Sequence, residues 1–195
     1  MKTYNIKLTL LEPMLGTIPK NPEIYKAYIA SKAPKENNNG DELETVEDLE
    51  EKNWTGFHMV DGNPILYDYV IKGFFKDACS MLRRVSGSKS SALKSHKKII
   101  DGLVFIEPRQ IPIDLKGQSI EIIERPLRAQ TAQGERITLT RSDACPIGST
   151  ICFDIKILGG VSKALLTEWL DYGKLRGLGQ WRNAGYGRFE YSFID

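Results

Sequence analysis

The residues best suited to chemistry lie near the C-terminal end, where four glycines (177, 179, 185 and 187) fall within eleven positions. Glycine permits positive φ and lets backbone N–H groups come close to a ligand. Arginine forks bind phosphates, and aromatic rings stack on bases. This combination predicts a glycine-rich loop at 177–187 that holds an extended polyanion. Its candidate binding residues are Gly177, Gly179, Gln180, Trp181, Arg182, Asn183, Gly185 and Tyr186.

The order of elements around this loop argues against a mononucleotide or dinucleotide site. Nucleotide-binding folds run strand, glycine loop, helix, which brings the phosphate to a helix N-terminus. Here an apolar helix at 162–172 precedes the loop, and a strand at 188–194 follows it. The sequence also has no Gly-Lys-Ser/Thr element of a P-loop. The alternative to a ligand loop is a helix C-cap with a tight turn, with Trp181 and Tyr186 packed in the core.

Two further groups of basic residues are candidates for phosphate contact. One lies on a predicted helix at 66–84, whose apolar residues recur at steps of three and four. The other lies in a predicted β-hairpin with strands at 121–125 and 136–140 and a long polar tip. The alternatives are a solvated helix face and a solvent-exposed hairpin. The candidates are Lys72, Lys76, Arg83 and Arg84 on the helix, and Arg125, Arg128 and Arg136 in the hairpin.

The net charge of +2 hides a strong asymmetry along the chain. Residues 36–51 carry eight acidic residues and no basic one, whereas residues 72–98 hold eight basic residues and a single acid, Asp77. A basic body with one acidic segment fits a polyanion binder. The acidic segment could also imitate nucleic acid toward a basic partner protein. A solvated helix face beside a polar loop explains the same charges without any ligand.

Catalytic and metal-ligating patterns are weak. Metal-free RNA cleavage needs a general base near the 2′-hydroxyl and a cation for the phosphate. The two histidines, His58 and His96, lie in different contexts. His96 stands among three lysines and could serve, although a solvated surface histidine is the simpler interpretation. No cluster of His, Cys and carboxylates has metal-ligand spacing. We therefore expect no metal and no cofactor, and we keep both histidines only as weak catalytic candidates.

A chain of 195 residues is long enough for one domain with a substantial core. We predict a single domain at 1–195 with a polar, acidic insertion at about 33–53. No apolar run approaches the roughly 18 residues of a membrane span, and the first residues enter a strand without room for a signal peptide. The three scattered cysteines are typical of reduced thiols. These features predict a cytoplasmic protein without membrane contact.

Hydrophobic periodicity gives both strand and helix signals. Period-two alternation and short apolar runs predict strands at 4–10, 57–60, 103–106, 110–113 and 150–157, besides the hairpin. Helical spacing predicts helices at 22–31, 66–84 and 162–172, and the segment at 86–91 is predicted to be flexible. Helices segregated on an antiparallel sheet indicate an α+β fold.

Several stretches resemble conserved motifs of the RAMP superfamily, the repeat-associated proteins of CRISPR systems. Residues 68–78, Asp-Tyr-Val-Ile-Lys-Gly-Phe-Phe-Lys-Asp-Ala, resemble its Ser-x-x-Lys-Gly-x-x-Arg helix start, with Lys76 in place of the arginine. The C-terminal Gly-x-Gly…Gly-Tyr-Gly-Arg-Phe resembles its glycine-rich loop, which also follows a helix and precedes the closing strand. The segments at 11–16 and 145–155 fit the same scheme. Residues 3–16, 66–84 and 145–195 carry the resemblance.

The resemblance implies a modified RRM, or ferredoxin-like, fold with helices on one face of an antiparallel sheet and a protruding hairpin. It also implies RNA binding, since some members coat a guide RNA and others cleave precursor RNA, and their hairpins often wedge between nucleotides. Our main hypothesis is a non-catalytic protein that binds single-stranded RNA or DNA, as a homo-oligomer or in a larger complex. The alternatives are a metal-independent endoribonuclease and a phage or mobile-element assembly or decoy protein.

One expectation follows for the loop itself. If its glycines bring backbone N–H groups against phosphate, a Cβ at Gly179 or Gly185 should obstruct that approach. Gly179→Val or Gly185→Val should then weaken nucleic-acid binding by about tenfold, with only a modest loss of stability because the loop is expected to be exposed.

Overall fold

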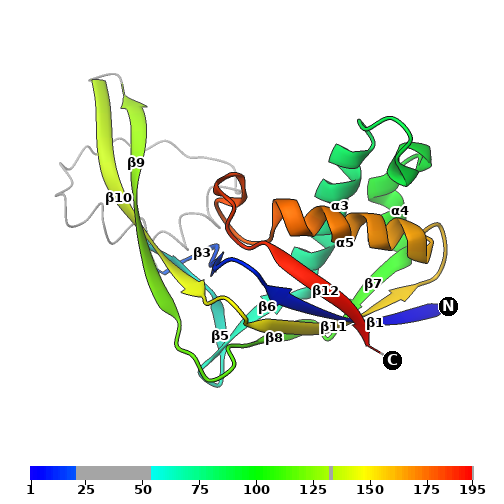
Figure 1. Cartoon of the computed structure of the whole chain (residues 1–195), viewed down its shortest axis with the longest axis horizontal. Coiled ribbons are helices and arrows are strands. Elements are labelled where there is room, and N and C mark those ends of the chain that lie inside the picture. Colours follow the sequence, from blue (N-terminus) through cyan, green and yellow to red (C-terminus); the bar gives the residue numbers. More distant parts are fainter. Residues whose placement is uncertain (21–53, 132–133, 195) are drawn as a thin grey trace, which may run out of the picture.

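The computed structural model describes residues 1–20, 54–131 and 134–194, and within this part the chain forms two sheets and three α-helices (Figure 1). The side chains of 127–131, 134–136 and 138 are not described. The α+β class predicted from the sequence is confirmed. No helix in the described part of the chain is long and apolar enough to cross a membrane.

The larger sheet has seven strands among the described residues, in the order β12-β1-β11-β8-β6-β5, with β7 also paired to β11. Neighbouring strands are antiparallel throughout. β1 lies between β11 and β12, so the two chain ends meet in this sheet. The strands are β1 Lys2–Leu10, β5 His58–Val60, β6 Asn63–Tyr67, β7 Val104–Glu107, β8 Gln110–Asp114, β11 Thr150–Ile157 and β12 Phe189–Ile194.

Three helices lie on one side of this sheet: α3 (Asp68–Leu82), α4 (His96–Leu103) and α5 (Lys163–Arg176) (Figure 1). α5 begins after Ser162, whose hydroxyl accepts a hydrogen bond from the Leu165 N–H at 3.1 Å, and this N-cap satisfies a backbone donor that the helix leaves open. It ends at Gly177, which has a φ of 73°. A short 3-10 helix, η1 (Lys89–Ala92), connects α3 to α4.

Apolar side chains of α3 and α5 form the core together with the inner face of the sheet. Phe75 and Trp169 are fully buried and their rings pack 5.6 Å apart. Alternate residues of β1 point into the same layer, as the period-two pattern predicts. The buried residues of these elements are Ile6, Leu8, Leu10, Ile71, Phe74, Phe75, Ala78, Cys79, Leu165, Leu166, Trp169 and Leu170.

The second sheet carries a long hairpin. Its order is β2-β10-β4-β3, with β9 paired to β10. β9 and β10 are antiparallel, whereas β4 runs parallel to β10. Figure 1 shows the hairpin extending away from the larger sheet, with the glycine-rich loop between its foot and α5. The strands are β2 Met14–Leu15, β3 Ile18–Pro19, β4 Trp54–Gly56, β9 Glu121–Thr131 and β10 Gly134–Cys145.

Most predicted elements are confirmed, but the short strands β2, β3 and β4 were not predicted, and other elements differ in extent. The helix predicted at 66–84 is shorter, because Asn63–Tyr67 forms strand β6 and the helix starts at Asp68. Helix α4 was not predicted, and the segment predicted to be flexible at 86–91 contains part of η1. Both hairpin strands are longer than predicted. The helix predicted at 22–31 and the acidic insertion at 33–53 lie outside the described residues.

Candidate nucleic-acid interface

The glycine-rich loop (177–187) is closed by its own backbone and anchored to Pro13 and to Leu15 of β2. The Leu178 N–H donates to the Gly187 carbonyl at 2.9 Å, and the Gly187 N–H donates to the Pro13 carbonyl at 2.9 Å. The Gln180 N–H donates to the Leu15 carbonyl at 3.3 Å. These backbone donors are therefore used inside the protein, and the loop has a defined shape.

Close packing explains three of the loop glycines, at 177, 179 and 187. A Cβ on Gly179 would lie 2.5 Å from the Leu15 carbonyl oxygen, and one on Gly187 would lie 1.9 Å from the Leu178 oxygen. Both residues have positive φ, at 79° and 71°. The expectation that Gly179→Val spares stability is therefore wrong, because the backbone of Leu15 leaves no room for a side chain. At Gly185 the nearest atoms to a Cβ belong to the Arg188 guanidinium, at 3.5 Å.

A stacked pair joins the loop to the hairpin. The Arg125 guanidinium, from β9, lies over the Trp181 ring with its Cζ 3.8 Å from the ring centroid. Arg125 is only 4% exposed, and its Nη2 donates to the Ser142 hydroxyl at 3.0 Å. Its Nε and Nη1 have no hydrogen-bond partner within the described residues. Trp181 has a φ of 52°, which non-glycine residues adopt at a cost, and the stacking on Arg125 helps to hold it there.

Burial lowers the pKa of Arg125, and neighbouring Tyr186 acts in the opposite direction. An arginine nonetheless stays charged in proteins, so a permanent cation lies under the loop. Trp181 and Tyr186 are both half-buried rather than core residues.

A carboxylate from α3 holds two arginines beside the loop. Asp77 contacts Arg182 Nη1 at 2.9 Å and Arg176 Nε at 3.4 Å. Arg176 also donates to the side-chain oxygen of Asn183. One carboxylate faces two guanidinium groups, so this cluster keeps one net positive charge. It borders a surface hollow of about 530 Å³ lined by Arg176, Gly179, Gln180, Trp181, Arg182, Asn183 and Ala184.

The foot of the hairpin is fixed by a buried polar network. Asp143 of β10 is 6% exposed, accepts a hydrogen bond from Trp54 Nε1 at 2.8 Å and pairs with Lys20 Nζ at 2.7 Å. Thr55 and Ser142 share a hydroxyl hydrogen bond at 2.8 Å. Ser142 also receives the Arg125 hydrogen bond, so β4, β10 and the Arg125–Trp181 stack form one connected unit.

The basic residues predicted on α3 do not join this unit. Lys72 Nζ donates to the Asp101 carbonyl at 3.2 Å, and Lys76 Nζ pairs with the Asp101 carboxylate at 2.9 Å, so both face α4. Arg83, at the end of α3, contacts His96 of α4, and Arg84 is exposed. The basic residues predicted to contact phosphate therefore form two separate groups, one near α3 and one at the glycine-rich loop.

The predicted hairpin arginines also separate. Arg125 lies under the loop, at the foot of the hairpin. Arg128 and Arg136 lie farther along β9 and β10, where Arg128 is in register with Ile137 and Arg136 with Ala129. The side chains of Arg128 and Arg136 lie outside the described part of the chain.

His96 is a structural residue. It is 8% exposed, so the interpretation as a solvated surface histidine is wrong. Arg83 Nη1 donates to His96 Nδ1 at 3.0 Å, which leaves Nε2–H to donate to the Ser80 hydroxyl at 2.8 Å. Burial, with smaller effects of Arg83 and Lys97, lowers the pKa of His96. The neutral His96 imidazole is held between Arg83 and Ser80, and its hydrogen bonds connect α4 to α3.

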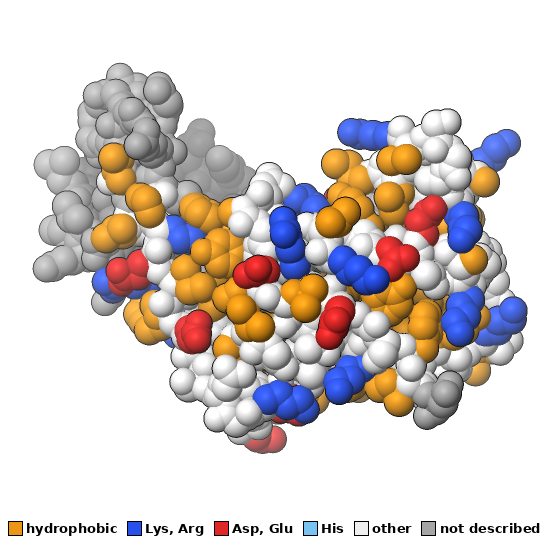
Figure 2. All heavy atoms as spheres, viewed as in Figure 1, with side chains coloured by type: hydrophobic (Ala, Val, Ile, Leu, Met, Phe, Trp, Pro, Cys, Tyr) orange, Lys and Arg blue, Asp and Glu red, His pale blue; other side chains and the backbone are white. Residues whose placement is uncertain are grey.

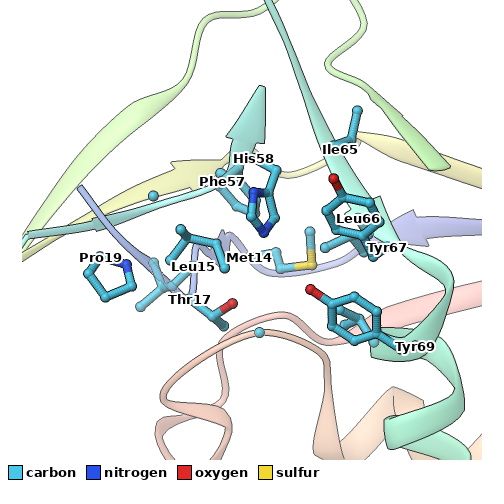
Figure 3. Close-up of a pocket in the computed structure, with 14 residues that line it drawn as sticks. Met14, Leu15, Thr17, Pro19, Phe57, His58, Ile65, Leu66, Tyr67 and Tyr69 are labelled. Atoms are coloured by element: carbon cyan, nitrogen blue, oxygen red, sulfur yellow. The ribbon is translucent and has the colours of Figure 1, made fainter. Parts of the chain in front are cut away.

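His58, in contrast, lines a cavity. This cavity of about 390 Å³ lies between β2, β5, β6, the start of α3 and Gly179 of the loop (Figure 3). The His58 ring meets the Tyr67 ring edge-on at 4.9 Å, and Tyr67 stacks on Tyr69 at 5.4 Å with 11° between the planes. The sequence analysis did not identify the two tyrosines, because Tyr67 ends strand β6 and Tyr69 lies in the first turn of α3, so no single periodicity links them.

Charged and apolar side chains are unevenly distributed on the surface. Figure 2 shows Lys and Arg side chains over the loop and the helical end, with Asp and Glu between them. The hairpin exposes apolar side chains instead: Ile122 is 56% exposed and Ile137 is 65% exposed. The acidic run at 36–51 lies outside the described residues, so the decoy hypothesis stays a prediction.

Comparison with known proteins bears on the fold. No protein-family model matches the sequence, and no curated protein matches it significantly. The fold is similar to that of a Type III-B Cmr-beta chain. That chain belongs to a complex solved by cryo-EM and bound to cognate target RNA, with a TM-score of 0.51 and 14% sequence identity. The match covers 100% of this chain but 61% of the other. At 14% identity this likeness concerns the fold.

Proposed function

We propose that the chain is a RAMP-type protein with an RRM-like fold that binds single-stranded RNA, without catalysing a reaction. The observation that carries the proposal is the Arg125–Trp181 stack, which fixes the glycine-rich loop against the foot of a protruding hairpin. Beside this stack lies the hollow with one net positive charge from Arg176, Arg182 and Asp77. A cationic hollow next to aromatic rings suits a phosphate backbone with splayed bases.

The hairpin supports an extended binding mode. Its strands β9 and β10 project beyond the sheet, and Ile122, Ile137 and Leu139 are exposed along it. We propose that these exposed apolar side chains contact a base or another protein. The chain of similar fold comes from a structure of Type III-B Cmr-beta bound to cognate target RNA. We propose an RNA strand and further protein subunits, in the cytoplasm, as the partners of this chain.

An isosteric charge change tests the proposal. Asn183→Asp keeps an oxygen for Arg176 but adds one negative charge to the hollow. An exposed charge about 4 Å from a phosphate is worth about 1 kcal/mol in water, so the dissociation constant for a 12-nucleotide rU strand should rise about fivefold at low salt. The matched control is Asn63→Asp, at the start of β6 and outside the hollow, which should bind as the parent does. Equal binding by all three proteins would remove the hollow from the interface.

His58 supports one second candidate, a metal-independent endoribonuclease. Its imidazole lies in a cavity beside the Tyr67 and Tyr69 rings, where a general acid or base could act. Incubation of end-labelled single-stranded and hairpin RNAs with parent protein and His58→Ala in EDTA separates this candidate from the main one. Products formed by the parent but not by the variant would establish the enzyme, whereas intact RNA in both would exclude it.

A further inference from the structure

Two buried side chains at the foot of the hairpin carry polar atoms without hydrogen-bond partners. Arg125 of β9 and Thr140 of β10 lie opposite each other in the register of the two strands. They are 4% and 7% exposed. Within the described part of the chain, nothing forms a hydrogen bond with Arg125 Nε, Arg125 Nη1 or the Thr140 hydroxyl. A buried polar group without a partner costs free energy, and a charged group costs most. These atoms are therefore suited to a polar ligand.

The chemistry of the unpartnered atoms favours an anionic ligand. Nε carries one N–H and Nη1 carries two, and the Thr140 hydroxyl can donate one further hydrogen. The Arg125 guanidinium is a permanent cation, and no carboxylate of the described residues forms an ion pair with it. A phosphate group supplies both the opposite charge and several acceptor oxygens, and its hydrogen bonds with a guanidinium are stronger than neutral ones.

The Trp181 indole covers the Arg125 guanidinium. The Cζ atom of Arg125 lies 3.8 Å from the centre of the Trp181 ring, and Trp181 also lines the cationic hollow, whereas Arg125 does not. A displacement of the indole would therefore join the buried cation to the hollow. Trp181 is half-buried and has a φ of 52°, and strained residues of this kind occur at sites that change conformation. Arg125 itself is held by the hydrogen bond from its Nη2 to Ser142.

We propose that the buried Arg125 guanidinium and the Thr140 hydroxyl bind one phosphate of the single strand, and that Trp181 is the cover of this site. In the free protein the indole lies on the guanidinium. When a strand enters the hollow, the indole moves aside and a phosphate takes its place beside Arg125. The proposal rests on the proposed function, because it names a phosphate subsite of that interface. The site recognises the backbone of the strand and not its bases.

Two substitutions remove the proposed phosphate ligands with little change in volume, Arg125→Met and Thr140→Val. Each has a matched control. Arg141→Met removes the same charge from the same hairpin, at a residue paired with Glu124, and Thr3→Val removes a hydroxyl from the start of β1, outside the hollow. Binding is measured at low salt for two 12-nucleotide strands of equal charge, rU and the same strand made abasic.

Thr140→Val is the decisive variant, because Arg125→Met also removes the stack on Trp181. Arg125→Met should weaken binding of both strands by about tenfold, or about 1.4 kcal/mol, and Thr140→Val by about threefold. The controls should bind both strands as the parent does. The melting temperature of Thr140→Val should not fall, since its hydroxyl has no partner among the described residues in the free protein.

Trp181→Ala tests the cover. Without the indole the phosphate no longer has to displace a ring, so the abasic strand should bind about threefold more tightly than it binds the parent. Adding Thr140→Val should cancel this gain. Unchanged or weaker binding of the abasic strand by Trp181→Ala would show that the indole is not a cover and would overturn that part of the proposal.

The other outcomes separate the subsite from the proposed function. If the parent binds both strands and Thr140→Val binds them as well as Thr3→Val does, the phosphate subsite is overturned and the proposed function stands. If the parent binds neither strand at low salt, the proposed function fails together with the subsite.

Discussion

Alanine at Gly187 should destabilise the protein far more than alanine at Gly185, although the two glycines are two residues apart in one loop. A Cβ at Gly187 would lie 1.9 Å from the Leu178 carbonyl oxygen, which is impossible without moving the backbone. At Gly185 a Cβ meets nothing nearer than the Arg188 guanidinium at 3.5 Å. Both positions have positive φ, so that cost is common to them.

The magnitudes follow from the contacts. Displacing Gly187 breaks its hydrogen bonds with Leu178 and Pro13, each worth about 1 kcal/mol, and positive φ costs an alanine about 1 kcal/mol more. Gly187→Ala should therefore lower the free energy of unfolding by about 3 kcal/mol and Gly185→Ala by about 1. In a chain of this size 1 kcal/mol corresponds to roughly 2–4 °C in Tm. The expected losses are about 6–12 °C and about 2–4 °C.

Urea denaturation and thermal melting followed by circular dichroism measure both variants. Gly73→Ala serves as a control, because a Cβ there meets nothing within 4 Å in the middle of α3. It should raise the free energy of unfolding by about 0.5–1 kcal/mol through helix propensity. If Gly187→Ala melts within a degree of Gly185→Ala, the loop is not packed as described, and the reasoning from its backbone contacts is refuted.

Three further predictions concern the rest of the molecule. Because the pKa of His96 is lowered in the folded protein, the unfolded chain takes up the proton first, so stability should be full above about pH 6.5 and decrease below it. Melting from pH 4 to 8 should show a smaller decrease for His96→Gln, and identical profiles would contradict this. In a double-mutant cycle, Arg125→Met and Trp181→Leu should couple by about 1 kcal/mol in urea denaturation, whereas additive effects would show that the stack contributes nothing. Iodoacetamide at pH 8 should alkylate exposed Cys152 in the native protein before Cys145, whose pKa burial raises to about 12, and peptide mass spectrometry showing early Cys145 labelling would contradict its burial.

The fold was predictable where a pattern repeats over many residues. Strands β1 and β11 and helix α5 follow from period-two and helical spacing, since each buries one face against the core. Helix α4 was not predicted because it is eight residues long and begins in a lysine run, where the periodic signal is short. Its position comes from tertiary contacts instead, through Asp101 to Lys72 and Lys76 and through His96 to Arg83.

The site was predictable only in part. The composition of the loop indicated Trp181 and Arg182 as binding candidates, and the structure gives each of them a contact inside the protein, with Arg125 and with Asp77. The partners of these residues could not be found from the sequence, since both are distant along the chain. Asp77 lies 105 positions from Arg182, and Arg125, which stacks on Trp181, lies in strand β9. The charge pattern of the sequence also did not show that Lys72 and Lys76 both pair with Asp101, or that Arg83 contacts His96.

The salt dependence of binding tests the central claim most directly. Cations that contact phosphates release counterions, and each contact contributes a slope of about −0.7 to log K against log salt concentration for a single strand. Two or three contacts at the glycine-rich loop should give a slope of about −1.4 to −2, or roughly a tenfold loss of affinity for the 12-nucleotide rU strand between 50 and 200 mM salt. Filter binding by the parent protein measures it. A slope in that range is the predicted result, and the absence of binding to any single strand at 50 mM salt would contradict the account.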